Sequence, residues 1–246
     1  MPLPTQDFDP TESGVPWHVL TAAGHQVAFA TPSGQLARAD PRMLTGAGLG
    51  LLKPFLAADR HGRLAYLAMQ ASPAFRAPLA YAALRAEDYD ALLLPGGHAK
   101  GMREYLESHV LQGLVTAMFA HDKPVGAICH GVVLVVRSLG PDGRSVLHGR
   151  QTTALLQAQE MLAYNLTRLW LHDYYRTYPQ TVQGEICEAL ASPADFITGP
   201  MPLRRDAPGK LRRGFAHRDG NYLSARWPGD AHRFANDFRD MLAGRH

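Results

Sequence analysis

The stretch PVGAICHG, residues 124–131, places a cysteine between an apolar run and the helical pattern VVLVV. Ala127 stands two residues before Cys129 and Gly131 two residues after it, and small neighbours of this kind permit a tight backbone bend. The pattern predicts a strand, a sharp turn and a helix, which is the plan of a nucleophile elbow. Because a helix N-terminus favours negative charge, we expect the pKa of the Cys129 thiol to be lowered. The alternative is a buried, inert cysteine at a strand end.

A second glycine-containing turn follows another apolar strand. The sequence DYDALLLPGGHAKGM predicts a buried parallel strand at Asp90–Leu94, followed by the turn Pro95, Gly96 and Gly97. A helix predicted over Met102–Phe119 returns the chain to the cysteine stretch and completes a β-α-β unit. Both turns therefore leave the carboxyl ends of parallel strands, the edge where open α/β sheets bind ligands.

Composition limits the class of protein. The chain has 246 residues, of which 46% are hydrophobic, enough for one large α/β domain. The formal charge is only +3 and the charges are scattered, so we expect no nucleic-acid partner. No signal peptide or long apolar run is present, and we expect no membrane partner and a cytoplasmic location. The two cysteines form no disulfide framework, and Cys187 lies in a helical pattern typical of a core residue.

The amino-terminal third is irregular. The opening MPLPTQDFDPTES is too rich in proline for a central strand, so the first strand is either a stub at residues 1–4 or lies upstream of Met1. Glu12 begins a helical stretch that ends near Gly24. Residues 35–85 hold short helical pieces among many Ala, Pro and Gly, and we expect this insertion to form a lid or pocket wall.

The remainder predicts further helices and one hairpin. Helical patterns cover Gln157 to about Tyr178 and then Gln183–Leu190. Near the end, Asp219-Gly220 predicts the turn of a β-hairpin, and a last helix follows. No internal repeat or linker divides the chain, so we expect a single domain over residues 1–246.

Four motifs in this order resemble the ThiJ/PfpI superfamily: PTES, AGHQVAFATPSG, ALLLPGGHAKGM and PVGAICHGVVLVV. The likeness covers about residues 9–138, and the insertion makes the chain similar to the larger branch that includes glyoxalase III and a heat-shock chaperone. The resemblance implies a three-layer α/β/α sandwich with a mostly parallel, flavodoxin-like sheet, as in class I glutamine amidotransferases. It also implies a homodimer.

The resemblance further implies roles for individual residues. Cys129 would be the nucleophile, Glu12 a proton-transfer carboxylate beside its sulfur, and His130 the acid/base residue. The backbone N–H groups of Gly97 and His130 would form the oxyanion hole. A carboxyl buried near a thiolate should have a raised pKa, which suits proton transfer at neutral pH. The residue that orients the histidine is not identified, because Gln157 stands near the place where relatives have an aspartate.

No cofactor or metal is expected. The 12 histidines show no metal-binding spacing, and neither HEXXH nor paired CXXC is present. We interpret His18, His98 and His121 as surface or loop residues without a role. A glutamine amidotransferase would need a His-X-Glu pair after the cysteine, and the chain lacks one there.

Three functions remain open at this point. The leading hypothesis is a cofactor-free enzyme that converts small reactive aldehydes, as glyoxalase III converts methylglyoxal to lactate. A hydrolase of amides or small peptides would use the same thiolate on a small-molecule or peptide substrate. A stress chaperone or redox sensor would need no turnover, and it predicts an exposed apolar patch.

Overall fold

A four-stranded sheet in the order β5-β6-β8-β7 forms the centre of the computed structural model, which describes residues 1–244. Its strands are β5 (Leu92–Leu94), β6 (Val125–Ile128), β7 (Ala216–Asp219) and β8 (Tyr222–Ala225). β6 runs parallel to both β5 and β8, and β7 is antiparallel at the edge. The predicted hairpin turn is confirmed, since β7 and β8 are joined through Gly220, whose φ is 60°.

Short parallel pairs lie at the amino-terminal side. β1 (Gln6–Phe8) pairs with β3 (Arg38–Ala39), and β2 (Ala30–Thr31) pairs with β4 (Leu79–Ala80). Pro2 forms an isolated parallel bridge with Ala30, and the Leu3 N–H donates to the Ala30 carbonyl at 2.8 Å. The stub expected at residues 1–4 is therefore present, and it leads into β1.

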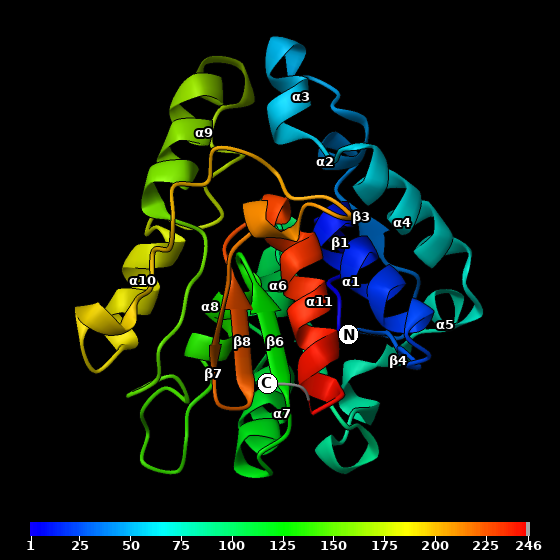
Figure 1. The fold of residues 1–246 in the computed structure, drawn as a ribbon, viewed down its shortest axis with the longest axis vertical. Coiled ribbons are helices and arrows are strands. Elements are labelled where there is room, and N and C mark those ends of the chain that lie inside the picture. The colour runs from blue at the N-terminus through cyan, green and yellow to red at the C-terminus, as the bar shows by residue number, and fades with distance from the viewer. Residues whose placement is uncertain (245–246) are drawn as a thin grey trace.

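Helices cover both faces of the sheet. Figure 1 shows α11 in front of β6 and β8, with α7 and α8 behind them. On the front face, Phe234 and Phe238 of α11 pack so closely over Gly126 that a Cβ there would lie 2.9 Å from the Phe238 ring. The resulting fold is a flavodoxin-like α/β sandwich. The α-helices are α1 (Pro10–Ala22), α2 (Pro41–Thr45), α3 (Lys53–Leu56), α4 (Arg60–Ala71), α5 (Pro73–Arg76), α6 (Arg103–Leu106), α7 (His109–Ala120), α8 (Gly131–Val136), α9 (Gln157–Leu171), α10 (Val182–Ala189) and α11 (Ala231–Leu242).

Two predicted helices are shorter than expected. The stretch Met102–Phe119 divides into α6 and α7. The first helix ends at Leu106 with Glu107 as its C-cap, and Ser108 caps the next helix by accepting the Leu111 N–H at 3.3 Å. The helix predicted to reach Tyr178 ends with α9 at Leu171, where His172 takes the left-handed value φ = 53°. The chain then turns back toward the sheet, and this return brings Thr177 to the elbow.

The insertion at residues 35–85 contains α2 to α5. Its longest helix, α4, packs against α1, where a Cβ on Gly14 would lie 2.6 Å from the Tyr66 backbone nitrogen. This close approach holds the insertion against the helix that carries Glu12. At the top of Figure 1, helix α3 of the insertion lies opposite α9.

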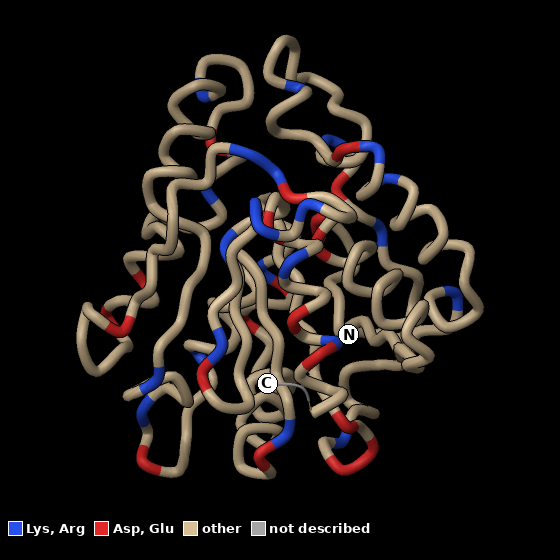
Figure 2. The backbone as a smooth tube through the Cα atoms, viewed as in Figure 1, with Lys and Arg blue, Asp and Glu red and all other residues tan. Residues whose placement is uncertain are grey.

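Charged residues of both signs are interspersed along the backbone in the view of Figure 2. Within residues 1–244, no helix has the length and apolar character needed to cross a lipid bilayer. Neither observation points to a membrane-spanning segment in the described part of the chain.

Candidate active site

The cysteine lies at a strained strand-to-helix bend, as the sequence predicts. Cys129 has φ = 58°, a left-handed conformation that costs a non-glycine residue about 1–3 kcal/mol. Its N–H donates to the Ala225 carbonyl of β8 at 3.0 Å, which fixes the bend against the sheet. Residue 131 must be glycine, because a Cβ at this position would lie 2.2 Å from the Leu94 carbonyl oxygen. The neighbouring strand β5 thus presses directly on the elbow.

Glu12 reaches the same bend from the first turn of α1. Asp9 caps this helix by accepting the N–H groups of Thr11 at 2.7 Å and Glu12 at 3.0 Å. The Glu12 side chain is fully buried, and its Oε2 accepts the Gly96 N–H at 2.9 Å. The Glu12 carboxyl lies close enough to the Cys129 thiol for the two groups to affect each other's pKa, and its Oε1 is buried without a hydrogen-bond partner. Folding therefore joins an amino-terminal carboxyl to the predicted nucleophile.

The pKa values of this pair are both raised. Burial, and secondly the nearby Asp9, raises the pKa of Glu12 well above its usual value, which favours the protonated form of this carboxyl. Burial, followed by the charges of Glu12 and Asp9, raises the pKa of the Cys129 thiol well above its usual value. The expectation of a lowered thiol pKa is therefore wrong. The six-residue helix α8 does not offset the desolvation of a sulfur with 0% exposure.

His130 supplies a base on the other side of the sulfur. Its Nδ1 lies 3.5 Å from Cys129 Sγ, and its Nε2 lies 3.1 Å from Thr177 Oγ1. The Thr177 hydroxyl donates to the His98 carbonyl at 2.5 Å, so toward His130 it can only accept. Nε2 of His130 must then carry the proton, which leaves Nδ1 free to accept the thiol proton. Burial, and secondly His98, lowers the pKa of His130, which keeps the ring neutral.

Thr177 was not found from the sequence. The candidates near the expected aspartate are engaged elsewhere: the Gln157 N–H donates to Gln183 Oε1 at 2.9 Å, and Glu160 accepts the Val182 N–H at 2.9 Å. A threonine in the loop between α9 and α10 gives no catalytic pattern in sequence. Only its contact with the ring of His130 identifies it.

His98 lies in the loop after β5, as one of the two expected alternatives has it, but it is buried at the elbow and does not lie on the surface. It is only 8% exposed, and its ring makes edge contacts with His130 and Tyr175 at centroid distances of 5.3 and 5.1 Å. Burial lowers its pKa to about 4, so the ring is neutral. The reason is that the loop after β5 folds over the elbow rather than outward.

The same loop contains the predicted oxyanion donor. Gly97 packs so tightly that a Cβ would lie 2.5 Å from the Asp7 carbonyl oxygen and 3.0 Å from Met102 Sδ. The backbone N–H of His130 is near enough to the Cys129 sulfur to lower its pKa, against the larger effect of burial. An amide directed at the sulfur is available to an oxygen on a carbon bonded to that sulfur, and the oxyanion role of Gly97 stays a prediction.

Three potential metal ligands also meet at the elbow. One ligand atom from each of His98, Cys129 and His130 lies within 4.8 Å of the others, a grouping found by searching residues 1–244. Imidazole nitrogen and thiolate sulfur are ligands that suit a soft divalent cation such as Zn²⁺. Chain spacing could not predict this set, because His98 belongs to a different loop.

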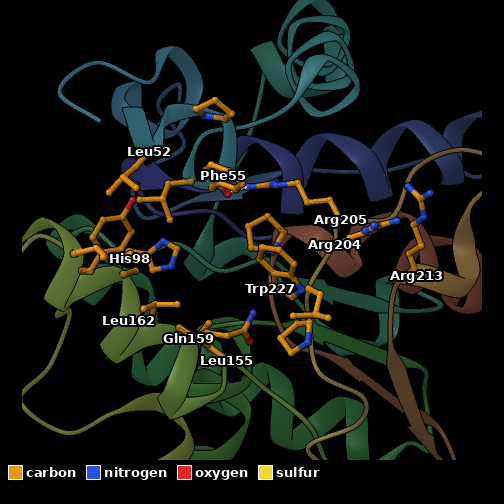
Figure 3. A pocket seen from close by; sticks show the side chains of 18 residues that line it. Leu52, Phe55, His98, Leu155, Gln159, Leu162, Arg204, Arg205, Arg213 and Trp227 are labelled. Atoms are coloured by element: carbon orange, nitrogen blue, oxygen red, sulfur yellow. Dashed lines mark hydrogen bonds between the residues drawn. The ribbon is translucent and has the colours of Figure 1, made fainter. Parts of the chain in front are cut away.

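A cavity of about 650 Å³ adjoins the site (Figure 3). One wall comes from the insertion through Leu52 and Phe55, and the other comes from α9 through Gln159 and Leu162. His98 lines the cavity, whereas Cys129 is not among the lining residues. His98 thus borders both the cavity and the sulfur, since one of its ring nitrogens lies within 4.8 Å of Cys129 Sγ.

Known proteins share this fold and part of this sequence. The chain is 24% identical over 151 residues to a glutathione-independent glyoxalase of Schizosaccharomyces pombe, covering 60% of this chain and 58% of that protein. It is 22% identical over 240 residues to a deglycase of Pyrococcus abyssi, covering 98% and 96%. The glyoxalase III structure from Candida albicans superposes with a TM-score of 0.68 at 18% identity, covering 100% of this chain and 96% of that one.

A family model agrees with these similarities. The ThiJ/PfpI family-like model matches residues 3–196, a span that contains Glu12, the turn at Gly97, the elbow and Thr177. The chain belongs to the ThiJ/PfpI family.

Proposed function

We propose that the protein is a cofactor-independent cysteine enzyme that acts on reactive carbonyl compounds, with the chemistry of a glyoxalase or deglycase. The observation that carries the proposal is that one sulfur lies between a buried carboxyl and a histidine ring nitrogen with complementary roles. The raised pKa of Glu12 favours a carboxyl that can donate a proton beside Cys129, and Nδ1 of His130, 3.5 Å from the sulfur, is free to take one. The names of the glyoxalase and deglycase relatives agree with this chemistry.

A 2-oxoaldehyde such as methylglyoxal illustrates the first step. The thiol proton of Cys129 passes to Nδ1 of His130 as the sulfur bonds to the aldehyde carbon. The resulting oxyanion lies at the amides of Gly97 and His130, and it takes the proton of Glu12. The product is a hemithioacetal, with Glu12 now ionised and His130 protonated.

An isomerisation and a hydrolysis complete the reaction. Glu12 removes the hydrogen from the thiol-bearing carbon while His130 protonates the adjacent carbonyl oxygen, which gives an enediol. Glu12 then returns its proton to the neighbouring carbon and His130 takes the hydroxyl proton, which gives a thioester. Water cleaves the thioester to a 2-hydroxy acid and restores the protons of Cys129 and Glu12. The overall change adds one water molecule to the oxoaldehyde.

The test is lactate formation from methylglyoxal. We expect Cys129→Ala to abolish it, whereas Cys187→Ala, which removes the other cysteine on α10, should retain it. We expect Glu12→Gln to lower the rate by about 10²- to 10⁴-fold, because Gln cannot transfer a proton. Equal rates for wild type and Cys129→Ala would overturn the proposal.

The fully buried sulfur calls for a second measurement. Because the His98 ring borders both the cavity and Cys129, His98→Ala should speed alkylation of Cys129 by iodoacetamide in a Cys187→Ser background. His121→Ala, at an exposed residue after α7, is the matched control. An unchanged alkylation rate in His98→Ala would mean that the substrate reaches the sulfur by another route.

The rim of the cavity favours a second candidate function, that of a chaperone. Phe55 and Leu203 line the cavity yet are 69% and 79% exposed, and Leu169 on α9 is 87% exposed. Apolar side chains gathered at an opening are typical of surfaces that bind unfolded chains. Suppression of aggregation that survives Cys129→Ala and falls in Phe55→Ser would support this function.

A further inference from the structure

The cavity beside His98 is much larger than a three-carbon aldehyde requires. Its volume is about 650 Å³, and most of its wall is apolar, with Leu52, Leu155, Leu162 and Leu166 among the lining residues. A pocket of this size accommodates a ligand with a sizeable apolar body. Such a ligand would still need polar groups on the wall to fix its orientation.

Arg205 is the charged group whose donors lack partners inside this cavity. Its Nε and Nη1 are buried and make no hydrogen bond, and only Nη2 is engaged, donating to the Phe55 carbonyl at 3.2 Å. The guanidinium lies over the Trp227 ring at 5.3 Å, and Figure 3 shows both side chains in the cavity. Trp227 Nε1 is likewise buried without a partner. Buried donors are rarely left unsatisfied, so these N–H groups indicate a ligand acceptor.

The charge around Arg205 is not balanced within the cavity. Arg204 and Arg213 also line it, and the lining residues include no aspartate or glutamate. In Figure 2 the loop after α10 shows a basic stretch followed by an acidic position where it crosses from the middle of α9 and passes below α3. Burial raises the pKa values of Asp9 and Glu12 behind the wall and the positive charge of Arg205 offsets only part of this effect, and no ion pair joins Arg205 to either carboxyl among the described residues. The wall therefore carries uncompensated positive charge.

We propose that Arg205 and Trp227 form a subsite for the carboxylate of the ligand. Two N–H groups of one guanidinium match the two oxygens of a planar carboxylate, and the indole N–H adds a third donor. The apolar wall takes the body of the ligand. Gln159 Oε1, buried on α9 without a partner, accepts from a hydroxyl or amide group.

The position of the subsite orients the ligand toward the sulfur. Arg205 and His98 line the same cavity, and the charge of Arg205 adds to burial in lowering the pKa of the His98 ring. A carboxylate on Arg205 therefore places the rest of a short ligand at the His98 end of the cavity. Resting on the proposed function, this assigns the substrate class as carbonyl compounds that carry a carboxylate.

Binding of hexanoate tests the subsite without turnover. Titration calorimetry with the full chain carrying Cys129→Ala should show hexanoate binding at least tenfold tighter than hexanamide, which has the same size but no charge. Arg205→Gln should remove this preference by weakening hexanoate about tenfold to a hundredfold. Arg205→Lys keeps the positive charge but loses the paired N–H donors of the guanidinium, so it should lower the hexanoate affinity less than Arg205→Gln does. Arg85→Gln, at an exposed residue that does not line the cavity, is the control and should leave the hexanoate affinity unchanged.

Equal affinities for hexanoate and hexanamide would overturn the subsite. It would also be overturned if Arg205→Gln left the hexanoate affinity intact while its thermal unfolding curve matched that of the parent protein. Stronger binding of inorganic phosphate than of hexanoate would also overturn the carboxylate assignment. A separate arm uses 4,5-dioxopentanoate, a carboxylate-bearing 2-oxoaldehyde, whose hydration yields 2-hydroxyglutarate. Its kcat/KM should exceed that of methylglyoxal in wild type and lose that advantage in Arg205→Gln. Arg205-dependent hexanoate binding without any turnover supports the subsite and overturns the proposed chemistry instead.

Discussion

Thr177 Oγ1 lies 3.1 Å from Nε2 of His130, so this threonine is the residue that orients the histidine, which the sequence left unidentified. Because the threonine hydroxyl donates to the His98 carbonyl, it accepts from Nε2 and selects the tautomer with a free Nδ1. A neutral orienting group leaves the histidine less basic than an aspartate would. A less basic histidine is compatible with a Cys129 thiol that is protonated at rest and loses its proton only when it reacts.

Thr177→Val should reduce the reactivity of Cys129, since it removes the acceptor that fixes the His130 tautomer. We expect alkylation of Cys129 in a Cys187→Ser background to slow by about tenfold, a part of the usual contribution of a general base. Thr177→Ser keeps the hydroxyl and should retain most of the rate. Equal rates for the valine and serine variants would show that the hydroxyl does not orient the ring.

The buried, neutral ring of His98 should make folding stability depend on pH. Its pKa falls from 6.5 to about 4 on folding, so between these values the unfolded chain binds a proton that the folded chain does not. The contribution of His98 is therefore fully present above about pH 6.5, is lost as the pH falls toward 4, and changes no further below that. Urea unfolding at pH 7.5 and 4.5 should show wild type losing stability relative to His98→Gln at the lower pH. His121→Gln keeps His98 and is the control, so its free energy of unfolding should follow that of wild type at both pH values. Parallel curves for wild type and His98→Gln would contradict this prediction.

The buried pair Arg226–Asp230 should be essential to the wall that carries Arg205. Two hydrogen bonds of 2.8 and 3.0 Å join side chains that are 1% and 0% exposed, and Arg226 also donates to the Thr198 carbonyl at 3.2 Å. Asp230→Ala leaves a buried charge unpaired, and we expect a loss of about 3–5 kcal/mol in the free energy of unfolding. The exposed pair Arg85–Asp88, 3.5 Å apart, is the control, and Asp88→Ala should cost less than about 1 kcal/mol. Similar losses in the two variants, measured by urea unfolding, would refute the distinction.

Gly96 should tolerate no side chain. A Cβ there would lie 2.7 Å from the His130 nitrogen and 2.9 Å from both Glu12 Oε2 and the Ile128 carbonyl oxygen. Gly96→Ala should therefore displace Glu12 and destabilise the fold by about 1–3 kcal/mol. Gly113→Ala, on an exposed position of α7 with no atom within 4 Å of the new Cβ, should stabilise by about 0.5–1 kcal/mol. Thermal unfolding of both variants checks the prediction, and a neutral Gly96→Ala would contradict the packing described for the site.

Much of the architecture could be predicted from local pattern. Local pattern predicted the apolar strands β5 and β6, the bend at Cys129 and the turn at Gly220. These features depend on apolar runs, small residues and turn residues that are neighbours in the sequence. Glu12 was predicted through the order of motifs rather than through its own surroundings. The split between α6 and α7 was missed, since a single capping serine decides it.

What the sequence alone determined was the family, the sheet and the elbow that holds Cys129. The tertiary structure decided the electrostatic state of the site, because burial depends on what covers a residue and not on its neighbours in the chain. It raised the pKa of a thiol that the adjacent helix was expected to acidify. It also brought His98 and Arg205 from separate loops to one cavity and placed Thr177, from a third loop, against His98 and His130. No spacing along a chain records a contact between loops.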